Sequence, residues 1–351
     1  MFFAGSRVVY LDLLRFLAVF LVLGSHLNYY VTFENELLNS ILTFWRKVGW
    51  SGVDLFFVLS GYLIASILFR EIERSGTLNV KRFLTRRMLK ILPPYFALVG
   101  FVLTYDFLIT KRFDFNQLIH FLTFTQNYEA ELWESVWPLE HSWSICIEEH
   151  FYVMLPFLIV SRKRARRIYP IVVALVLLGC FSMRWMSSDE IVKNHRFAYM
   201  SHLRLDALLF GTFFAWMEFM SLQKKLENKC MIVISLVVIV MAVVYFWFIP
   251  NKVLTYTFVF LFYGVVLLLA KKIEIKGHWS LVPFIFVGQC SYSIYLWHIP
   301  VREYMIPMLS LESHAAVFFA YMVGSLVVGI SMGYAIEKPF LKIRDRFFMA
   351  T

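Results

Sequence analysis

The sequence predicts an all-helical membrane protein, a polytopic bundle of transmembrane helices, from its composition and from the arrangement of its apolar residues. Hydrophobic residues make up 60% of the 351 residues, charged residues make up 17%, and the mean hydropathy is +0.67. The apolar residues form runs near the ~20 residues that span a bilayer. Helix is the expected structure for such runs because lipid cannot satisfy free backbone groups. This composition excludes a disordered chain and argues against a soluble enzyme, and the four cysteines exclude a disulfide scaffold.

About ten apolar runs follow one another along the chain, and each predicts a span. They cover residues 8–27, 51–69, 91–109, 143–160, 168–186, 203–221, 230–249, 254–270, 284–307 and 315–336. The 143–160 run is short, which leaves open a segment that only partly crosses the membrane. No internal repeat, low-complexity tract or long soluble insertion separates the runs, so we expect one integral-membrane domain over residues 1–351.

The basic residues predict the orientation of this bundle. If the N-terminus is cytoplasmic, 23 of the 34 Lys and Arg residues fall in cytoplasmic segments and eight fall in outer segments. Basic residues concentrate on the cytoplasmic side of membrane proteins, so both termini are expected in the cytoplasm. The net charge of +10 therefore indicates membrane topology, and no nucleic-acid partner is expected.

The first span carries Arg15 and His26, in addition to Asp12 near its start. Eleven residues of helix correspond to about three turns and ~16 Å, so both side chains are expected on one helix face. Charged groups inside a bilayer are costly and are therefore functional candidates. His26 titrates near neutral pH and suits a general base, although a lone histidine near a helix end is often an ordinary interfacial residue.

Further titratable residues are expected in the outer half of the bundle. They are Asp54, Glu148, Glu149, Arg204, Asp206 and His298. Spacing by three or four residues puts Ser144, Glu148 and Tyr152 on one helix face, and likewise Ser291, Tyr295 and His298. Ordinary explanations stay open: Asp54 as an acid favoured at a helix start, and the Tyr-Trp-His residues as an interfacial belt. Arg204 is a possible counter-ion for the paired glutamates.

A basic cluster is expected in the cytoplasmic loop before Pro93 and Pro94. Its members are Lys81, Arg82, Arg86, Arg87 and Lys90. Such a cluster can hold phosphate groups, and it can equally anchor the topology through anionic lipid. The cysteine spacings match no metal site, and the chain has no glycine-rich phosphate loop.

Six motifs, in order along nearly the whole chain, together resemble the acyltransferase type three family of integral-membrane acyltransferases. The motifs are Arg15-x10-His26 after Leu11-Asp12, the block Gly52–Gly61, the block Trp143–Tyr152, Arg204-Leu-Asp206, the block Ser291–His298, and Glu337-Lys-Pro339. Two departures stand out. Cys146 and His150 replace the usual Ser and Gln beside the paired glutamates, and Lys90 ends the family's Arg-x-x-Arg motif that begins at Arg87.

The resemblance implies transfer of an acyl group, usually acetyl, from cytoplasmic acyl-coenzyme A to an extracytoplasmic carbohydrate such as lipopolysaccharide or exopolysaccharide. It implies a multi-pass protein of the inner (cytoplasmic) membrane, surrounded by lipid, with acetyl-CoA as co-substrate and no metal. The family often carries a fused extracytoplasmic hydrolase-like domain, and none is expected in residues 1–351. Whether His26 acts as a base or carries the acyl group stays open.

The resemblance and the residues together assign three sets of site residues. The catalytic set is His26, Arg15, Glu148 and Glu149. The substrate-binding set is Asp54, Arg204, Asp206, Ser291, Tyr295 and His298. The cofactor-binding set is Arg82, Arg86, Arg87 and Lys90. The competing interpretations are a transporter or flippase of a glycan or lipid-linked intermediate, and a non-catalytic glycan-binding subunit.

Overall fold

The computed structural model describes residues 9–28, 30–129, 137–159, 163–221, 252–272 and 278–348, together with residues 236 and 240. These residues form helices joined by turns, and no strand occurs among them. The prediction of an all-helical protein is therefore confirmed.

Several helices are long and apolar enough to cross a membrane, as expected of a multi-pass membrane protein. Within the described residues there are five, or six if one bent pair of helices counts as a span. The five are Gly52–Ser75, Val80–Thr110, Ile168–Met186, Val253–Lys272 and His314–Phe347.

The expected number of ten spans stays a prediction. The runs at 8–27 and 143–160 form helices of only 17 and 16 residues. The run at 203–221 forms a helix that carries Arg204, Asp206 and Glu218. The run at 230–249 lies outside the described residues, apart from residues 236 and 240.

The chain divides into two compact units. Unit 1 comprises Met1–Val53, Lys81–Ser142 and Ile275–Thr351. Unit 2 comprises Asp54–Val80 and Trp143–Glu274. The expectation of a single domain over the whole chain stays a prediction.

Unit 1 is built around its first helix, α1 (Val9–Ser25). It packs against α2 (Glu36–Gly49), α13 (Val282–Gln289) and α14 (Ser291–Pro300), and α14 packs in turn against α16 (His314–Met332). At Gly288 of α13, a Cβ atom would lie 1.9 Å from the carbonyl oxygen of Asp12. Only glycine lets the two backbones approach this closely.

The segment expected as one span at 284–307 is bent. The helical stretch Trp279–Gln289, formed by η5 (Trp279–Leu281) and α13, meets the stretch Ser291–Met308 at 63°. The second stretch comprises α14, the π-helical turn η6 (Val301–Met305) and α15 (Ile306–Met308). Gly288 and Ser291 flank the break, and Gly/Ser pairs are a recurrent cause of sharp kinks. The span expected at 284–307 therefore contains a sharp bend, and its crossing of the membrane stays a prediction.

The basic cluster lies on a helix and not in a loop. Helix α4 runs from Val80 to Thr110 and includes both Pro93 and Pro94. The residues before the prolines are mostly Lys, Arg, Leu and Met, which are strong helix formers, and membrane helices tolerate internal proline. The loop prediction is therefore wrong, because the prolines do not end the helix.

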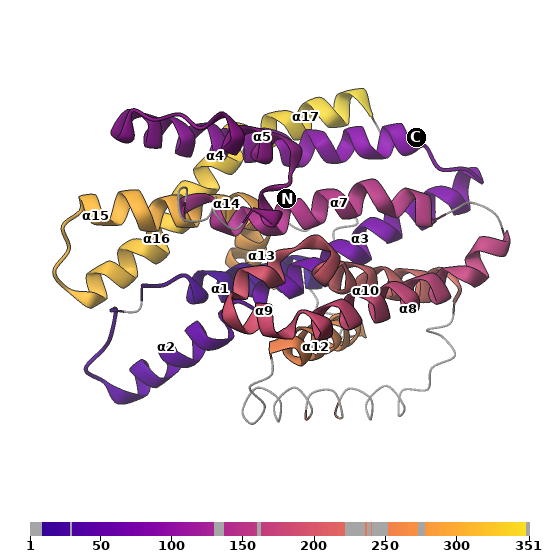
Figure 1. Ribbon diagram of the computed structural model, residues 1–351, viewed down its shortest axis with the longest axis horizontal. Coiled ribbons are helices and arrows are strands. Elements are labelled where there is room, and N and C mark those ends of the chain that lie inside the picture. The colour runs from indigo at the N-terminus through magenta and orange to yellow at the C-terminus, as the bar shows by residue number, and fades with distance from the viewer. Residues whose placement is uncertain are drawn as a thin grey trace. The chain divides into compact units, whose positions relative to one another are not determined.

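The remaining elements of unit 1 are short or extend longer helices. They are α5 (Phe115–Thr123), η1 (Gln126–Tyr128), η2 (Trp137–Ser142), the π-helical turn η7 (Gly333–Glu337) and α17 (Lys338–Phe347). Through η7, α16 continues into α17, whose far end lies beside the first half of α4 (Figure 1).

Unit 2 is built around α10 (Ser201–Phe219), which packs against α7 (Trp143–Leu158), α8 (Lys163–Met186) and α12 (Lys252–Lys272). The short elements α9 (Ser188–Lys193) and η3 (His195–Tyr199) connect α8 to α10. Helix α3 (Gly52–Ser75) meets α10 through Gly61 and Gly211. A Cβ at either glycine would lie 1.9 or 2.2 Å from a carbonyl oxygen of the other helix, so small residues set this close contact.

Candidate active site

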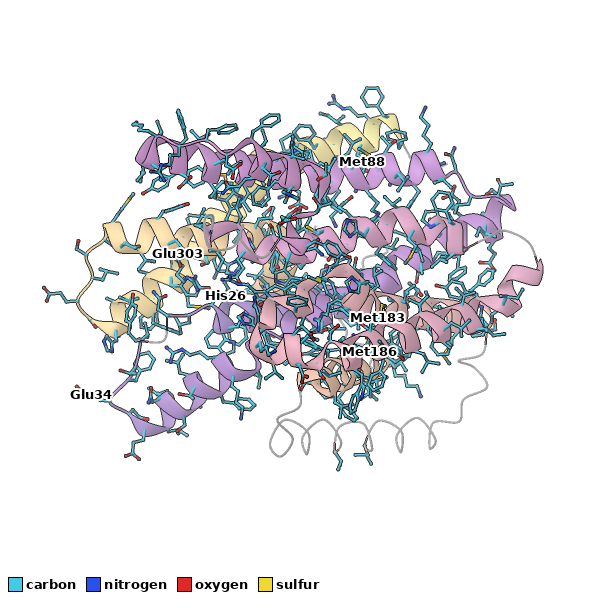
Figure 2. All side chains as sticks on the ribbon, viewed as in Figure 1. His26, Glu34, Met88, Met183, Met186 and Glu303 are labelled. Carbon is cyan, nitrogen blue, oxygen red and sulfur yellow. The ribbon has the colours of Figure 1, made fainter. Side chains whose placement is uncertain are left out.

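Three histidines from distant parts of the chain come together in unit 1: His26 after α1, His141 in η2 and His298 in α14. Nδ1 of His26 lies 3.2 Å from Nε2 of His298. The His298 ring centroid lies 4.9 Å from that of His26 and 5.1 Å from that of His141. His26 lies among the helices of its unit, whereas Glu34 lies at the edge (Figure 2). We refer to His26, His141 and His298 as the histidine cluster.

Hydrogen bonds between η2 and α14 hold two members of the histidine cluster in place. Nδ1 of His298 lies 2.6 Å from the carbonyl oxygen of Tyr295, one helical turn earlier. The Tyr295 hydroxyl donates to the carbonyl of His141 at 2.6 Å, and Nε2 of His141 lies 3.0 Å from the carbonyl of Leu296. Both imidazoles are buried, and burial lowers the pKa of His141 to about 3, so that this ring is neutral.

His26 is the half-buried member of the histidine cluster. Its Nδ1 lies 3.0 Å from the carbonyl of Val22, and its own carbonyl accepts a hydrogen bond from Nη1 of Arg302 at 2.9 Å. Arg302 is also paired with Glu303 at 2.5 Å. These contacts fix both the backbone and the ring of His26, whose partial exposure leaves part of the side chain accessible.

Arg15 lies near the opposite end of α1 from His26 and contacts different groups. Its Nη1 is 2.8 Å from Oδ1 of Asp12, and Oδ2 of Asp12 accepts from Gln289 of α13 at 3.1 Å. The two residues of the Arg-x10-His motif therefore contact different partners: Arg15 contacts Asp12, and His26 contacts His298.

The other predicted residues of α14 are buried. Ser291 and Tyr295 are 4% and 6% exposed. Tyr295 contacts the histidine cluster as described above. The neighbouring Ser293 donates to Oε2 of Glu337 at 2.7 Å, which ties the Glu-Lys-Pro motif to the same helix.

The predicted cofactor-binding residues lie on the first turns of α4 and meet other basic residues of unit 1. Arg86 donates to the carbonyl of Phe348, just after α17. Arg87 lies over the Phe83 ring at 5.9 Å. The half-buried Lys90 has four charged residues near it: Arg15, Glu337, Arg87 and Arg344. Arg82 is also half-buried. Positive charges from α1, α4 and α17, and the negative charge of Glu337, therefore lie near Lys90.

In unit 2, the predicted residues Asp54, Arg204 and Asp206 form buried ion pairs. Arg204 Nη2 lies 2.8 Å from Oδ1 of Asp54, and Arg184 Nη1 lies 2.6 Å from Oδ2 of Asp206. All four residues are at most 2% exposed. Arg204 was expected as a counter-ion for Glu148 and Glu149; that expectation is wrong, because Asp54 takes this place.

Aromatic rings and backbone groups complete the surroundings of these two arginines. The Arg204 guanidinium lies 3.9 Å from the ring centroid of Tyr256 in α12. Arg184 donates to the carbonyl of Leu203 at 2.5 Å and to the hydroxyl of Thr257 at 2.9 Å. The ion pairs therefore join α3, α8 and α10 within unit 2, and the contacts with Tyr256 and Thr257 add α12.

The paired glutamates on α7 are both half-buried. Tyr152 donates to Oε2 of Glu148 at 2.6 Å, and the hydroxyl of Ser60 lies 2.6 Å from that of Tyr152. This contact confirms that Glu148 and Tyr152 share a helix face. His150, one of the departures from the family pattern, has its Nδ1 2.7 Å from the hydroxyl of Ser201.

Comparison with protein families shows to which family this helical chain belongs. The model of the acyltransferase type three family, described as an acyltransferase domain, matches residues 8–334. The chain belongs to this family. The expected enzyme class, an acyltransferase, is thereby confirmed at the level of the family.

Two curated relatives carry the same kind of name. The O-acetyltransferase OatA of Staphylococcus aureus is 28% identical over 319 residues, which cover 83% of this chain and 50% of that protein. The peptidoglycan O-acetyltransferase OatA of Listeria monocytogenes is 28% identical over 337 residues, which cover 88% of this chain and 51% of that protein. The chain spans about half the length of the curated relatives it matches. No solved structure matches the chain.

Three residues that contact the predicted site residues were not predicted from the sequence of this acyltransferase type three family member. They are His141, Arg184 and Tyr256. A signal existed for two of them. His141 stands two residues before the Trp143 motif, and Arg184 is a charged residue inside the 168–186 run. Tyr256 gave no signal, because tyrosine is common near the ends of spans.

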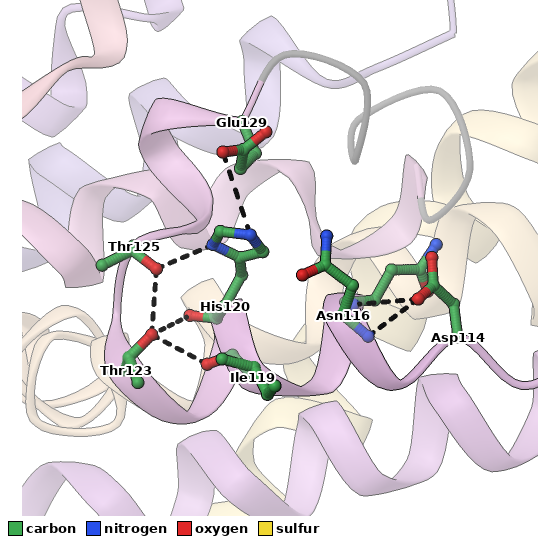
Figure 3. A network of polar contacts seen from close by, with 8 residues as sticks. Asp114, Asn116, Ile119, His120, Thr123, Thr125 and Glu129 are labelled. Carbon is green, nitrogen blue, oxygen red and sulfur yellow. Dashed lines mark hydrogen bonds and ion pairs between the residues drawn. The ribbon is translucent and has the colours of Figure 1, made fainter.

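A further polar network surrounds α5 (Figure 3). Asp114 accepts hydrogen bonds from the first backbone N–H groups of the helix, and His120 Nδ1 lies 2.8 Å from the hydroxyl of Thr125. Nε2 of His120 lies 3.8 Å from Glu129. Phe124, at the helix end, has a φ of 56°. These contacts cap both ends of α5, and we assign them a structural role.

No group of three or more His, Cys, Asp or Glu side chains suited to a metal ion occurs in the part of the chain that the structure describes.

Proposed function

We propose that this protein is a membrane O-acyltransferase that moves an acetyl group from cytoplasmic acetyl-CoA to a hydroxyl of an extracytoplasmic carbohydrate. In this proposal the chain crosses the cytoplasmic membrane about ten times, with both termini in the cytoplasm. The observation that carries the proposal is the half-buried His26, held by His298, in a chain of the acyltransferase type three family.

His26 supplies the base for the transfer. A hydroxyl is a weak nucleophile until a base removes its proton, and imidazole is suited to this role near neutral pH. The acceptor oxygen forms a bond to the thioester carbon as His26 takes the hydroxyl proton. The carbon–sulfur bond then breaks, and the proton passes to the departing thiolate. A variant of this route, in which His26 first carries the acetyl group covalently, uses the same residue.

The acceptor is a carbohydrate of the cell envelope. The Listeria relative is named a peptidoglycan O-acetyltransferase, which supports a glycan such as peptidoglycan, lipopolysaccharide or exopolysaccharide. In this proposal Glu148 and Glu149 of unit 2 bind acceptor hydroxyls. Ser291 and Tyr295 of unit 1 are substrate-binding residues as well. Asp54, Arg204 and Asp206 support acceptor binding through the helices that their ion pairs hold together.

The donor binds at the basic cluster of Arg82, Arg86, Arg87 and Lys90 with its phosphate groups, while Arg15 steers the thioester arm. Replacing Arg86 and Arg87 together with Gln should raise the KM for acetyl-CoA, because each charge-assisted bond contributes roughly 1.5–3 kcal/mol when shielded from water and less when wet. An unchanged KM in a correctly inserted double variant would assign the cluster to membrane anchoring only.

The central experiment compares His26→Gln with the wild-type protein, purified in detergent or reconstituted in vesicles. Protein-dependent loss of the acetyl-CoA thioester and appearance of an acetylated glycan are measured. Removal of a general base typically lowers the rate 10²–10⁴-fold, so His26→Gln should be nearly inactive. Retention of more than about a tenth of wild-type turnover would move the base to another residue.

A glycan transporter or flippase is the second candidate, and the bent pair α13–α14 is the observation that favours it, since broken helices recur in transporters. The same assay separates the two functions. A transporter leaves the thioester intact, as does a non-catalytic glycan-binding subunit.

A further inference from the structure

We propose that His298 is a positioning residue: it holds the ring of His26 as the Nδ1–H tautomer, so that the lone pair of Nε2 faces the acceptor hydroxyl. This inference rests on the proposed function of His26 as the base. It follows from three hydrogen bonds: one made by Nδ1 of His298 and two made by Nδ1 of His26. The donor in the first bond determines which atom donates in the other two.

The first bond fixes the tautomer of His298. Its Nδ1 lies 2.6 Å from the carbonyl oxygen of Tyr295, and a carbonyl oxygen can only accept. Nδ1 of His298 therefore carries a hydrogen. The ring is 0% exposed, and burying a charge is costly, so it is neutral. In a neutral imidazole with Nδ1–H, Nε2 carries a lone pair.

The second and third bonds fix the tautomer of His26. Nδ1 of His26 lies 3.2 Å from Nε2 of His298, which carries a lone pair, and 3.0 Å from the carbonyl oxygen of Val22. Both partners are acceptors, so Nδ1 of His26 must be the donor. Ser25 does not compete, because its hydroxyl donates to the carbonyl of Val22 at 2.8 Å. The lone pair of neutral His26 is therefore on Nε2.

This arrangement supports each proton transfer of the proposed reaction. When Nε2 of His26 takes the proton of the acceptor hydroxyl, the ring becomes an imidazolium that still donates from Nδ1 to His298. A hydrogen bond from a charged donor is stronger than one from a neutral donor, so His298 stabilises the charged form. When the thiolate receives that proton, His26 returns to its starting tautomer. In Ser-His-Asp sites a carboxylate orients the histidine in this way; here a neutral imidazole does so.

The surroundings of His298 prevent it from turning away. The Tyr295 carbonyl that holds Nδ1 of His298 belongs to the residue whose hydroxyl donates to His141, and His141 in turn contacts the carbonyl of Leu296. Rotation of the His298 ring would break its 2.6 Å bond inside a buried site.

Two substitutions at position 298 test the inference. His298→Leu removes one of the two acceptors of His26 Nδ1 and leaves the Val22 carbonyl, while keeping a buried side chain of similar size. His298→Gln can place an amide oxygen near the former Nε2 and accept the same bond. We expect His298→Leu to lower kcat at least 100-fold with the KM for acetyl-CoA changed less than threefold, because loss of the correct tautomer costs up to about 10⁴-fold in comparable sites. His298→Gln should retain at least a tenth of wild-type kcat.

His120→Leu is the matched control, because it makes the same chemical change in a histidine that contacts Thr125 and Glu129 instead of His26 (Figure 3). It should keep wild-type kcat. Equal losses in the Leu and Gln variants at position 298, or full activity in His298→Leu, would overturn the inference.

A spectroscopic measurement separates this inference from the proposed function. In ¹⁵N-histidine-labelled protein, His26 is assigned as the signal lost in His26→Gln. Its ring shifts should report Nδ1–H in the wild type and a mixture of tautomers in His298→Leu. A wild-type Nε2–H tautomer would refute the role of His298 whether or not the protein transfers acetyl groups. The expected tautomer in a protein without transferase activity would support the role of His298 and refute the proposed function alone.

Discussion

The buried ion pair between Asp54 and Arg204 offers the most quantitative test of the structure. We consider Arg204→Met, Asp54→Leu and the double variant. The two residues are 1% and 2% exposed and lie 2.8 Å apart, so either single change leaves a charge away from water without its closest partner. Breaking a buried pair in this way costs about 3–5 kcal/mol.

Arg204→Met also removes the guanidinium from the face of Tyr256, at a ring distance of 3.9 Å. A desolvated cation over an aromatic ring contributes about 2 kcal/mol. Arg204→Met should therefore destabilise by about 5–7 kcal/mol and Asp54→Leu by about 3–5 kcal/mol. The double variant leaves neither charge behind, so its loss should be only about 2–3 kcal/mol, well below the sum.

The assay is a double-mutant cycle on the free energy of unfolding in mixed detergent micelles, followed by helical circular dichroism. Asp345→Asn provides the control, because its pair with Arg344 is largely exposed and such pairs contribute about 0–1 kcal/mol. If the losses of the two single variants simply added in the double variant, the pair would make no coupled contribution, and the structural role assigned to it would be refuted.

Two further predictions concern topology and helix contact. Single cysteines at Lys111 and Glu73, both exposed, should react with membrane-impermeant reagents from opposite sides of the membrane; reaction from the same side would contradict the proposed orientation. Gly61→Ala should destabilise by about 1–3 kcal/mol, because its methyl group would meet a carbonyl oxygen 1.9 Å away. Gly100→Ala, with nothing within 4 Å, should instead stabilise by up to about 1 kcal/mol; a loss at both glycines would refute the contact explanation.

The sequence predicted the helical class and one shared helix face because these depend on local patterns. Runs of apolar residues report helices directly, and the Ser-Glu-Tyr spacing on α7 placed Glu148 and Tyr152 on one face. Helix boundaries were less certain. The span expected at 91–109 began too late, because the strong helix formers before Pro93 extend α4 back to Val80.

Contacts between distant residues could not be predicted from the sequence in this way. Asp54 and Arg204 are 150 residues apart, and their spacing carries no information about which acid pairs with which base. His26 and His298 were both expected in the outer half, but depth alone does not place two rings in contact. His141 stood outside every predicted span, so its part in the histidine cluster depends on how η2 packs against α14.

The wide separation of the histidine cluster along the chain also has a consequence for biosynthesis. His26 and His298 are 272 residues apart, and all of unit 2 is encoded between them. At about 5–20 residues per second, a ribosome needs roughly 14–54 s to reach His298 after His26. During that interval Nδ1 of His26 has the Val22 carbonyl as an acceptor but lacks His298. If His26 and His298 act as proposed, activity requires translation past His298, so chains released earlier would be inactive.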